Sequence, residues 1–180
     1  LLIIGVVLAV SELTWNRPVD DLAVVFVMDR SASVGGAGHQ QAVDFISEAV
    51  RHQGRKDRAG VVVFGAEALV DREPQEDLHV NGVESTPSPH QTDIASALRL
   101  GTALLPADRT RRIVLLTDGE QTRGDAASQA MLTAGADLQI SVAAVGTETG
   151  PEVLLEDLIV PARVDQGAAF DVKVVANAQV

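Results

Sequence analysis

Seven consecutive apolar residues, Leu22–Met28, constrain the fold of this chain more than any other feature. A short, uninterrupted apolar run between turn-forming residues is typical of a strand buried on both faces, as in parallel sheets. The run ends at Asp29-Arg-Ser-Ala-Ser33, and a helical pattern follows Val34-Gly-Gly-Ala-Gly38. One carboxylate and two hydroxyls therefore follow a central strand directly. Ligands of open α/β sheets bind at this carboxyl edge.

Strand and helix patterns alternate along the chain as far as Gly146. Further buried strands are predicted at Gly60–Phe64, Ile113–Leu116 and Leu138–Val145. Apolar residues with the spacing of a helix that lies on a sheet occur over residues 38–53, 94–105 and 124–136. This alternation favours a parallel sheet with right-handed crossovers. The predicted fold is α/β: a Rossmann-like, doubly wound, mostly parallel sheet with helices on both faces.

A long irregular segment separates the second buried strand from the next helix. Residues 65–70 are predicted to turn into a short edge strand, and residues 71–91 show no sustained periodicity and contain three prolines. A loop of this length in a compact domain is usually functional.

The pattern changes after Gly146. Val153–Val160 and Ala169–Ala176 alternate apolar and polar residues, which is typical of antiparallel strands with one solvated face. We therefore expect three parts: residues 1–19 as the end of a transmembrane segment plus a linker, residues 20–150 as the α/β domain, and residues 151–180 as the first strands of an incomplete, β-sandwich-like domain.

The N-terminal stretch Leu1–Val10 is uncharged and mostly aliphatic. It is shorter than the roughly 20 residues that a membrane-spanning helix needs, so we interpret it as the last turns of such a helix. Trp15 and Arg17 would suit the membrane interface. A buried element of the domain or the core of a signal peptide are the alternatives.

Composition excludes several classes of function. The net charge of −11 argues against a nucleic-acid partner, which would require a basic surface. The absence of cysteine excludes disulfides, thiolate metal sites and cysteine nucleophiles. No phosphate-binding glycine motif or Gly-x-Ser-x-Gly elbow occurs. The four histidines are scattered, and we expect all of them at the surface.

Two other segments bring oxygen-bearing side chains to the same predicted edge. Thr92 follows the long loop, and Asp118 ends the strand Ile113–Leu116 after one further residue. Loops at the carboxyl edge of a doubly wound sheet converge. We therefore predict an all-oxygen divalent-cation site made of Asp29, Ser31, Ser33, Thr92 and Asp118. Such a set suits Mg²⁺, with Mn²⁺ or Ca²⁺ as alternatives.

Each of these segments also has an ordinary structural explanation. Ser31 and Ser33 are common turn or helix-cap residues, and either Thr92 or Asp93 suits the N-cap of the helix that follows. Asp118-Gly119 is a frequent turn dipeptide, and Gly124-Asp125 suits a helix start.

Taken together, three segments resemble the metal-ion-dependent adhesion site of von Willebrand factor A domains. They are Asp29-Arg-Ser-Ala-Ser33, Thr92-Asp-Ile-Ala-Ser-Ala-Leu98 and Leu115-Leu-Thr-Asp-Gly119. The resemblance implies that the five predicted residues coordinate Mg²⁺ or Mn²⁺, directly or through water, and that a partner's Asp or Glu fills the open position. It covers about residues 20–147, and the family usually continues with a further helix and strand where this chain changes pattern.

The chain as a whole is similar to bacterial membrane-anchored proteins of this family. We therefore predict a non-enzymatic, metal-dependent protein-binding module for adhesion or scaffolding, tethered to a membrane through its N-terminal segment, with the A domain on the extracytoplasmic side. The alternative is a Mg²⁺-dependent hydrolase or phosphotransferase that uses the same strand-end carboxylates. A structural domain that binds no metal is a third possibility.

Overall fold

The structure is a computed structural model, and it describes residues 21–135, 137–146, 152–159 and 173–179. The chain divides into two compact units after Gly146. The predicted membrane segment, residues 1–19, lies outside the described residues. Among the residues that are described, no helix is long and apolar enough to span a bilayer.

The first unit is built on one five-stranded sheet, in the order β3-β2-β1-β4-β5. The strands are β1 (Leu22–Asp29), β2 (Arg58–Phe64), β3 (Ala68–Gln75), β4 (Thr110–Thr117) and β5 (Leu138–Ala144). All neighbours pair in parallel except β2 and β3, which are antiparallel. The mostly parallel sheet predicted from the alternating patterns is confirmed, and the run Leu22–Met28 forms its central strand.

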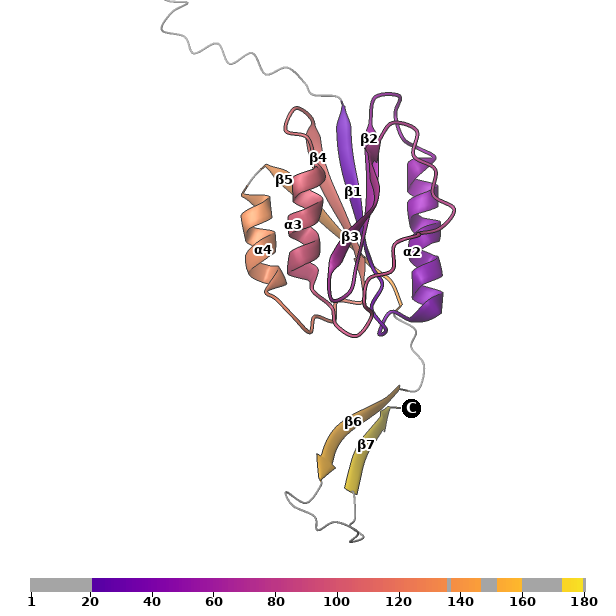
Figure 1. The fold of residues 1–180 in the computed structure, drawn as a ribbon, viewed down its shortest axis with the longest axis vertical. Helices are drawn as coiled ribbons and strands as arrows, with labels where there is room; N and C mark the ends of the chain where they lie inside the picture. The colour runs from indigo at the N-terminus through magenta and orange to yellow at the C-terminus, as the bar shows by residue number, and fades with distance from the viewer. Residues whose placement is uncertain (1–20, 136, 147–151, 160–172, 180) are drawn as a thin grey trace, which may run out of the picture. The chain divides into compact units, whose positions relative to one another are not determined.

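Helices cover both faces of this sheet, as predicted (Figure 1). They are α2 (Gly35–Val50), α3 (Ile94–Leu104) and α4 (Ala126–Ala134). Successive side chains of β1 point to opposite faces, so Phe26 and Met28 pack in the core under α2, whereas Val25 and Val27 pack in the core under α3. This double burial explains why β1 is apolar at every position from Leu22 to Met28 instead of at alternate ones.

The edge strand β3 is longer than predicted, because it continues through Asp71 as far as Gln75. Pro74 signalled a loop, yet it lies at an irregularity where the pairing shifts between Ala59 and Val61. A bulge on an edge strand tolerates the missing N–H of proline. Gly60 makes the close approach possible, since a Cβ atom there would lie 2.9 Å from the Pro74 nitrogen.

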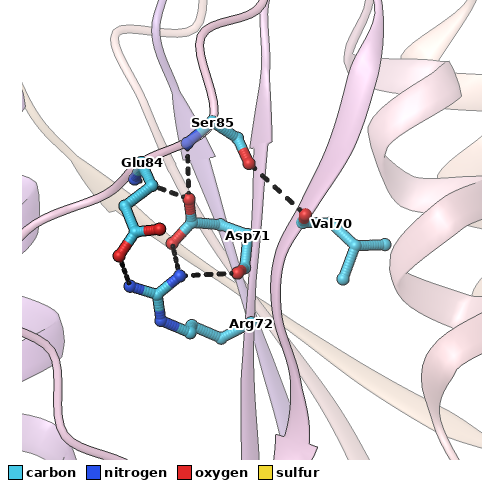
Figure 2. Close-up of polar contacts among 5 residues, drawn as sticks. All are labelled: Val70, Asp71, Arg72, Glu84 and Ser85. Carbon is cyan, nitrogen blue, oxygen red and sulfur yellow. Dashed lines mark hydrogen bonds and ion pairs between the residues drawn. The ribbon is translucent and has the colours of Figure 1, made fainter.

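Part of the irregular segment of residues 76–93 is bonded to the edge strand β3. The Asp71 side chain is fully buried, and its Oδ1 accepts hydrogen bonds from the backbone N–H groups of Glu84 and Ser85, each at 2.7 Å (Figure 2). The Arg72 guanidinium pairs with the Glu84 carboxylate at 2.7 Å. The buried Asp71 carboxylate and the Arg72 guanidinium therefore hold the stretch at Glu84 and Ser85 beside an edge strand that would otherwise be open to pairing.

The second unit contains β6 (Glu152–Ile159) and β7 (Lys173–Gln179), which pair antiparallel as predicted. The strand β7 extends to Gln179, three residues beyond the predicted end at Ala176, and residues 169–172 of the predicted strand lie outside the described residues. A two-stranded sheet is marginally stable alone, so the pairing fits a domain that needs further strands. The β-sandwich-like architecture stays a prediction.

The irregular segment beside β3 leads to a prediction for Gly65, at the turn between β2 and β3. A Cβ atom at this position would lie 2.2 Å from the backbone oxygen of Ser88, which holds the long segment. We expect Gly65→Ala to lower the free energy of unfolding by about 1–3 kcal/mol, measured by urea denaturation. Gly82→Ala is the control, because a Cβ atom there would meet nothing within 4 Å. Equal stabilities of the two variants would contradict the prediction.

Candidate metal centre

The site is organised by Asp29, the last residue of β1, whose side chain is fully buried. Asp29 Oδ1 accepts a hydrogen bond from the backbone N–H of Ser31 at 2.8 Å, and Oδ2 accepts one from the Thr117 hydroxyl at 2.6 Å. The Thr117 Oγ1 atom in turn accepts from the Gly119 N–H at 3.1 Å. Asp29 is thereby linked to both of the loops that leave the adjacent strands β1 and β4.

The two serines lie in the turn between β1 and α2, with their hydroxyl oxygens 3.0 Å apart. Ser31 is buried, whereas Ser33 is exposed. The N-cap of α2 is Val34, and no side chain caps this helix. The alternative explanation of the serines as helix caps is therefore wrong. Between them, the Ala32 N–H donates to the Pro89 carbonyl at 2.9 Å, so the long segment also supports this turn.

Thr92 is buried, and it is held by the loop that follows β4. Its N–H donates to the Thr122 hydroxyl at 2.8 Å, and its carbonyl accepts from the backbone N–H groups of Thr122 and Arg123. The helix-cap role belongs to Asp93, whose carboxylate accepts from the Ser96 N–H. The structure thus ties Thr92 to the segment that contains Asp118, although no hydrogen bond among the described residues joins Thr92 directly to Asp29.

Asp118 is partly exposed at the end of β4, and its Oδ1 accepts from the Glu120 N–H at 2.9 Å. Its negative charge acts on Asp29. Burial is the main cause that raises the pKa of Asp29, and the Asp118 charge raises it further, whereas hydrogen bonds from Ser31 and Thr117 lower it. Among the described residues, neither carboxylate forms an ion pair with a lysine or arginine. Two carboxylates therefore share this edge without an ion pair to a cationic side chain of the described residues.

The donor set itself fits a hard divalent cation. The described residues contain no group of three or more His, Asp or Glu side chains that could hold a metal, so a cation at this edge must use hydroxyl oxygens as well as carboxylates. Serine and threonine hydroxyls together with two carboxylates are ligands that Mg²⁺ accepts, with water completing the shell.

Sequence reasoning missed three residues around the centre. Thr117 bonds Asp29, and Thr122 bonds Thr92. Only the strand register could have indicated Thr117: Met28 pairs with Leu116, so Asp29 and Thr117, the residues that follow them, lie side by side. His39 was expected at the surface but is half-buried, with Nε2 enclosed and without a hydrogen-bond partner. Burial and the nearby Arg30 charge lower the pKa of His39. The other three histidines are exposed.

Fold and site together define an α/β domain with oxygen donors gathered at the carboxyl edge of its central strands. The sequence matches the von Willebrand factor type A domain family over residues 24–121, which is more than half of the chain. The chain therefore belongs to the von Willebrand factor type A domain family, which confirms the predicted family, whereas the metal site stays a prediction. No curated protein matches the sequence.

Solved structures with low sequence identity share this fold. An aerotolerance-related membrane protein from Bacteroides fragilis aligns with a TM-score of 0.63 and 20% identity, over 87% of this chain and 81% of its own. The conserved hypothetical protein BatB from Bacteroides thetaiotaomicron aligns with a TM-score of 0.55 and 23% identity, over 67% and 65%.

A more distant match comes from the mussel byssus. Proximal thread matrix protein 1, in a structure described as having a zinc-occupied MIDAS motif, aligns with a TM-score of 0.54 and 18% identity. The match covers 69% of this chain but only 38% of the byssus protein. At these identities the likeness establishes the fold alone.

The raised pKa of Asp29 makes a prediction about stability without metal. Because the unfolded state ionises this carboxyl first as the pH rises, ionisation of Asp29 favours unfolding above the usual aspartate pKa of 3.8. In EDTA at pH 7, Asp29→Asn should therefore be at least as stable as the unmodified protein in urea denaturation. The difference should vanish as the pH falls towards about 3, because both states are then protonated.

Asp125 provides the control, because its pKa is shifted in the opposite direction to that of Asp29. This residue is the N-cap of α4, as predicted, and hydrogen bonds from Ser128 lower its pKa. Ionised Asp125 therefore stabilises the native state above the usual aspartate pKa, and this contribution is lost as the pH falls through the lowered one. Asp125→Asn should lose stability at pH 7 and not at low pH. A loss of stability at pH 7 for both variants would contradict the interpretation of Asp29.

Proposed function

We propose that this chain is a metal-dependent protein-binding module. In this proposal Asp29, Ser31, Ser33, Thr92 and Asp118 hold a divalent cation, and a carboxylate from a partner protein occupies the remaining coordination position. The observation that carries the proposal is the pair Asp29 and Asp118, whose charges meet at one sheet edge with no lysine or arginine paired to either among the described residues.

The balance of charges explains why such a site would bind a partner. A cation with charge +2 at this edge would be offset by two carboxylates, of which Asp118 is half-exposed and shared with solvent. The three other ligands are neutral hydroxyls that add no further negative charge, so a coordination position left to water can take one more anionic ligand. A bound metal would supply Lewis-acid attraction for a carboxylate, and the five residues would hold it beside Ser33, which is exposed to solvent.

Membership of the family and the zinc-occupied motif described for the byssus protein support divalent metal binding. We propose Mg²⁺ as the physiological ion, because oxygen ligands are hard and Mg²⁺ retains water and open positions readily. Membrane attachment is also a proposal, supported by the apolar Leu1–Val10 and by the description of the Bacteroides fragilis neighbour as a membrane protein. In that arrangement the domain would lie outside the cytoplasm.

Metal binding is tested by thermal unfolding in Mg²⁺ and in EDTA. A ligand that binds only the native state stabilises it by about 2.7 kcal/mol at a hundredfold excess over its Kd, so the melting temperature should rise with Mg²⁺ concentration. Asp29→Ala should abolish the rise. Ser33→Ala is the second variant, since Ser33 is exposed and its loss should weaken the Mg²⁺ effect with little change in EDTA. No Mg²⁺ effect on the unmodified protein would refute the proposal.

Carboxylate recognition is tested with labelled Gly/Ser peptides that carry one central Asp, followed by fluorescence anisotropy. We expect binding in Mg²⁺, none in EDTA, and none for the matched peptide with Asn. The hydrolase alternative is tested in parallel with p-nitrophenyl phosphate and Mg²⁺. Turnover that disappears in Asp29→Ala would favour the enzyme over the binding module.

A further inference from the structure

We infer that a second binding position lies beside the metal centre, in a hollow at the start of α2, and that it takes a second carboxylate from the same acidic partner segment. This inference rests on the proposed function and narrows its partner to segments with two acidic residues close in sequence. The hollow has a volume of about 270 Å³, and its lining includes Arg30, Gly36, His39, Gln40, Val43 and Asn81.

Arg30 is the group that would bind the second carboxylate. It follows Asp29 directly, and its side chain reaches the hollow instead of pairing with that carboxylate. In the part of the chain that the structure describes, the Arg30 guanidinium has no hydrogen bond and no ion pair. An unpaired, half-buried arginine is unusual in a chain of net charge −11, and guanidinium binds carboxylates in a two-pronged geometry.

The remaining lining offers polar groups and space without any acidic residue. The Nε2 atom of His39 is buried with no partner, and Asn81 contributes an exposed amide. The Gln40 amide is already used, because it donates to Asp44 at 2.9 Å. Gly36 leaves the first turn of α2 uncovered, since a Cβ atom there would meet nothing within 4 Å. A carboxylate at this end of a 16-residue helix also meets the positive end of the helix dipole.

The position of the hollow argues for a second acid on one partner segment. Arg30 and the first turn of α2 flank the turn that contains Ser31 and Ser33, so both binding positions belong to one loop and the helix after it. When one carboxylate of a partner segment binds the metal, the neighbouring residues of that segment therefore lie close to the hollow. A second acid within a few residues can reach Arg30 without a new binding surface.

The test uses the labelled Gly/Ser peptides at saturating Mg²⁺, with one central Asp or with a second Asp one to four residues away. We expect at least one two-Asp peptide to bind about three- to tenfold tighter than the single-Asp peptide. This gain in affinity is what one charge-assisted hydrogen-bonded pair contributes at a partly exposed site. Arg30→Gln should remove this gain and leave the affinity of the single-Asp peptide unchanged.

Two further variants separate charge in the hollow from general charge effects. Gly36→Glu places a carboxylate in the open first turn, where it suits the helix and should compete for Arg30, so it should also remove the gain. Arg55→Gln changes the net charge equally but lies beyond the far end of α2, roughly 24 Å away at 1.5 Å per residue. Arg55→Gln should therefore keep the gain.

The outcomes distinguish the two proposals. If no peptide binds in a Mg²⁺-dependent way, the proposed function fails. If single-Asp peptides bind but no spacing of a second Asp helps, or if the gain persists in Arg30→Gln, the inference alone is overturned. Inorganic phosphate is the third probe: competition by phosphate that depends on Arg30, without any gain from a second Asp, would show a small-anion site instead and would also overturn it.

Discussion

The arrangement of the candidate metal centre depends on one buried carboxylate at the end of the central strand. Asp29 is enclosed at a place where the sheet is apolar on both faces, so its charge is costly to bury unless it is bonded. The Ser31 backbone and the Thr117 hydroxyl meet part of that cost. The pKa of Asp29 is raised even so, which means that these hydrogen bonds do not offset the whole cost of burying the charge. We propose a cation for this reason, because a divalent ion beside Asp29 would favour its ionised form.

The same loops that bond Asp29 also hold one another. The long segment reaches from the buried Asp71 at the sheet edge to Pro89, whose carbonyl supports the serine turn, and then to Thr92. Thr92 is in turn bonded to Thr122 in the loop after β4. Three segments that are distant in sequence are therefore fixed relative to each other by backbone hydrogen bonds. Such preorganisation lets short hydroxyl side chains act as ligands without a large ordering cost on binding.

Much of the fold could be predicted because its signals are local. The uninterrupted run Leu22–Met28 indicated a doubly buried strand, and the helical stripes placed α2, α3 and α4 within a few residues. The edge strand was less predictable, since Pro74 is compatible with β3 only at the irregularity in its pairing with β2. His39 was misplaced for a similar reason. Its burial comes from packing around the serine turn, and no feature of its own sequence neighbourhood reveals that.

The sequence by itself determined the class of fold and the family, since apolar periodicity and the three short motifs are properties of contiguous residues. It also named the oxygen-bearing residues from which a metal site is proposed. Only the tertiary structure decided how Thr117 and Thr122 support them, that Asp93 and not Thr92 caps α3, and that Arg30 lines a hollow and does not pair with Asp29. These features depend on strand register and on hydrogen bonds between distant loops, which no local pattern encodes.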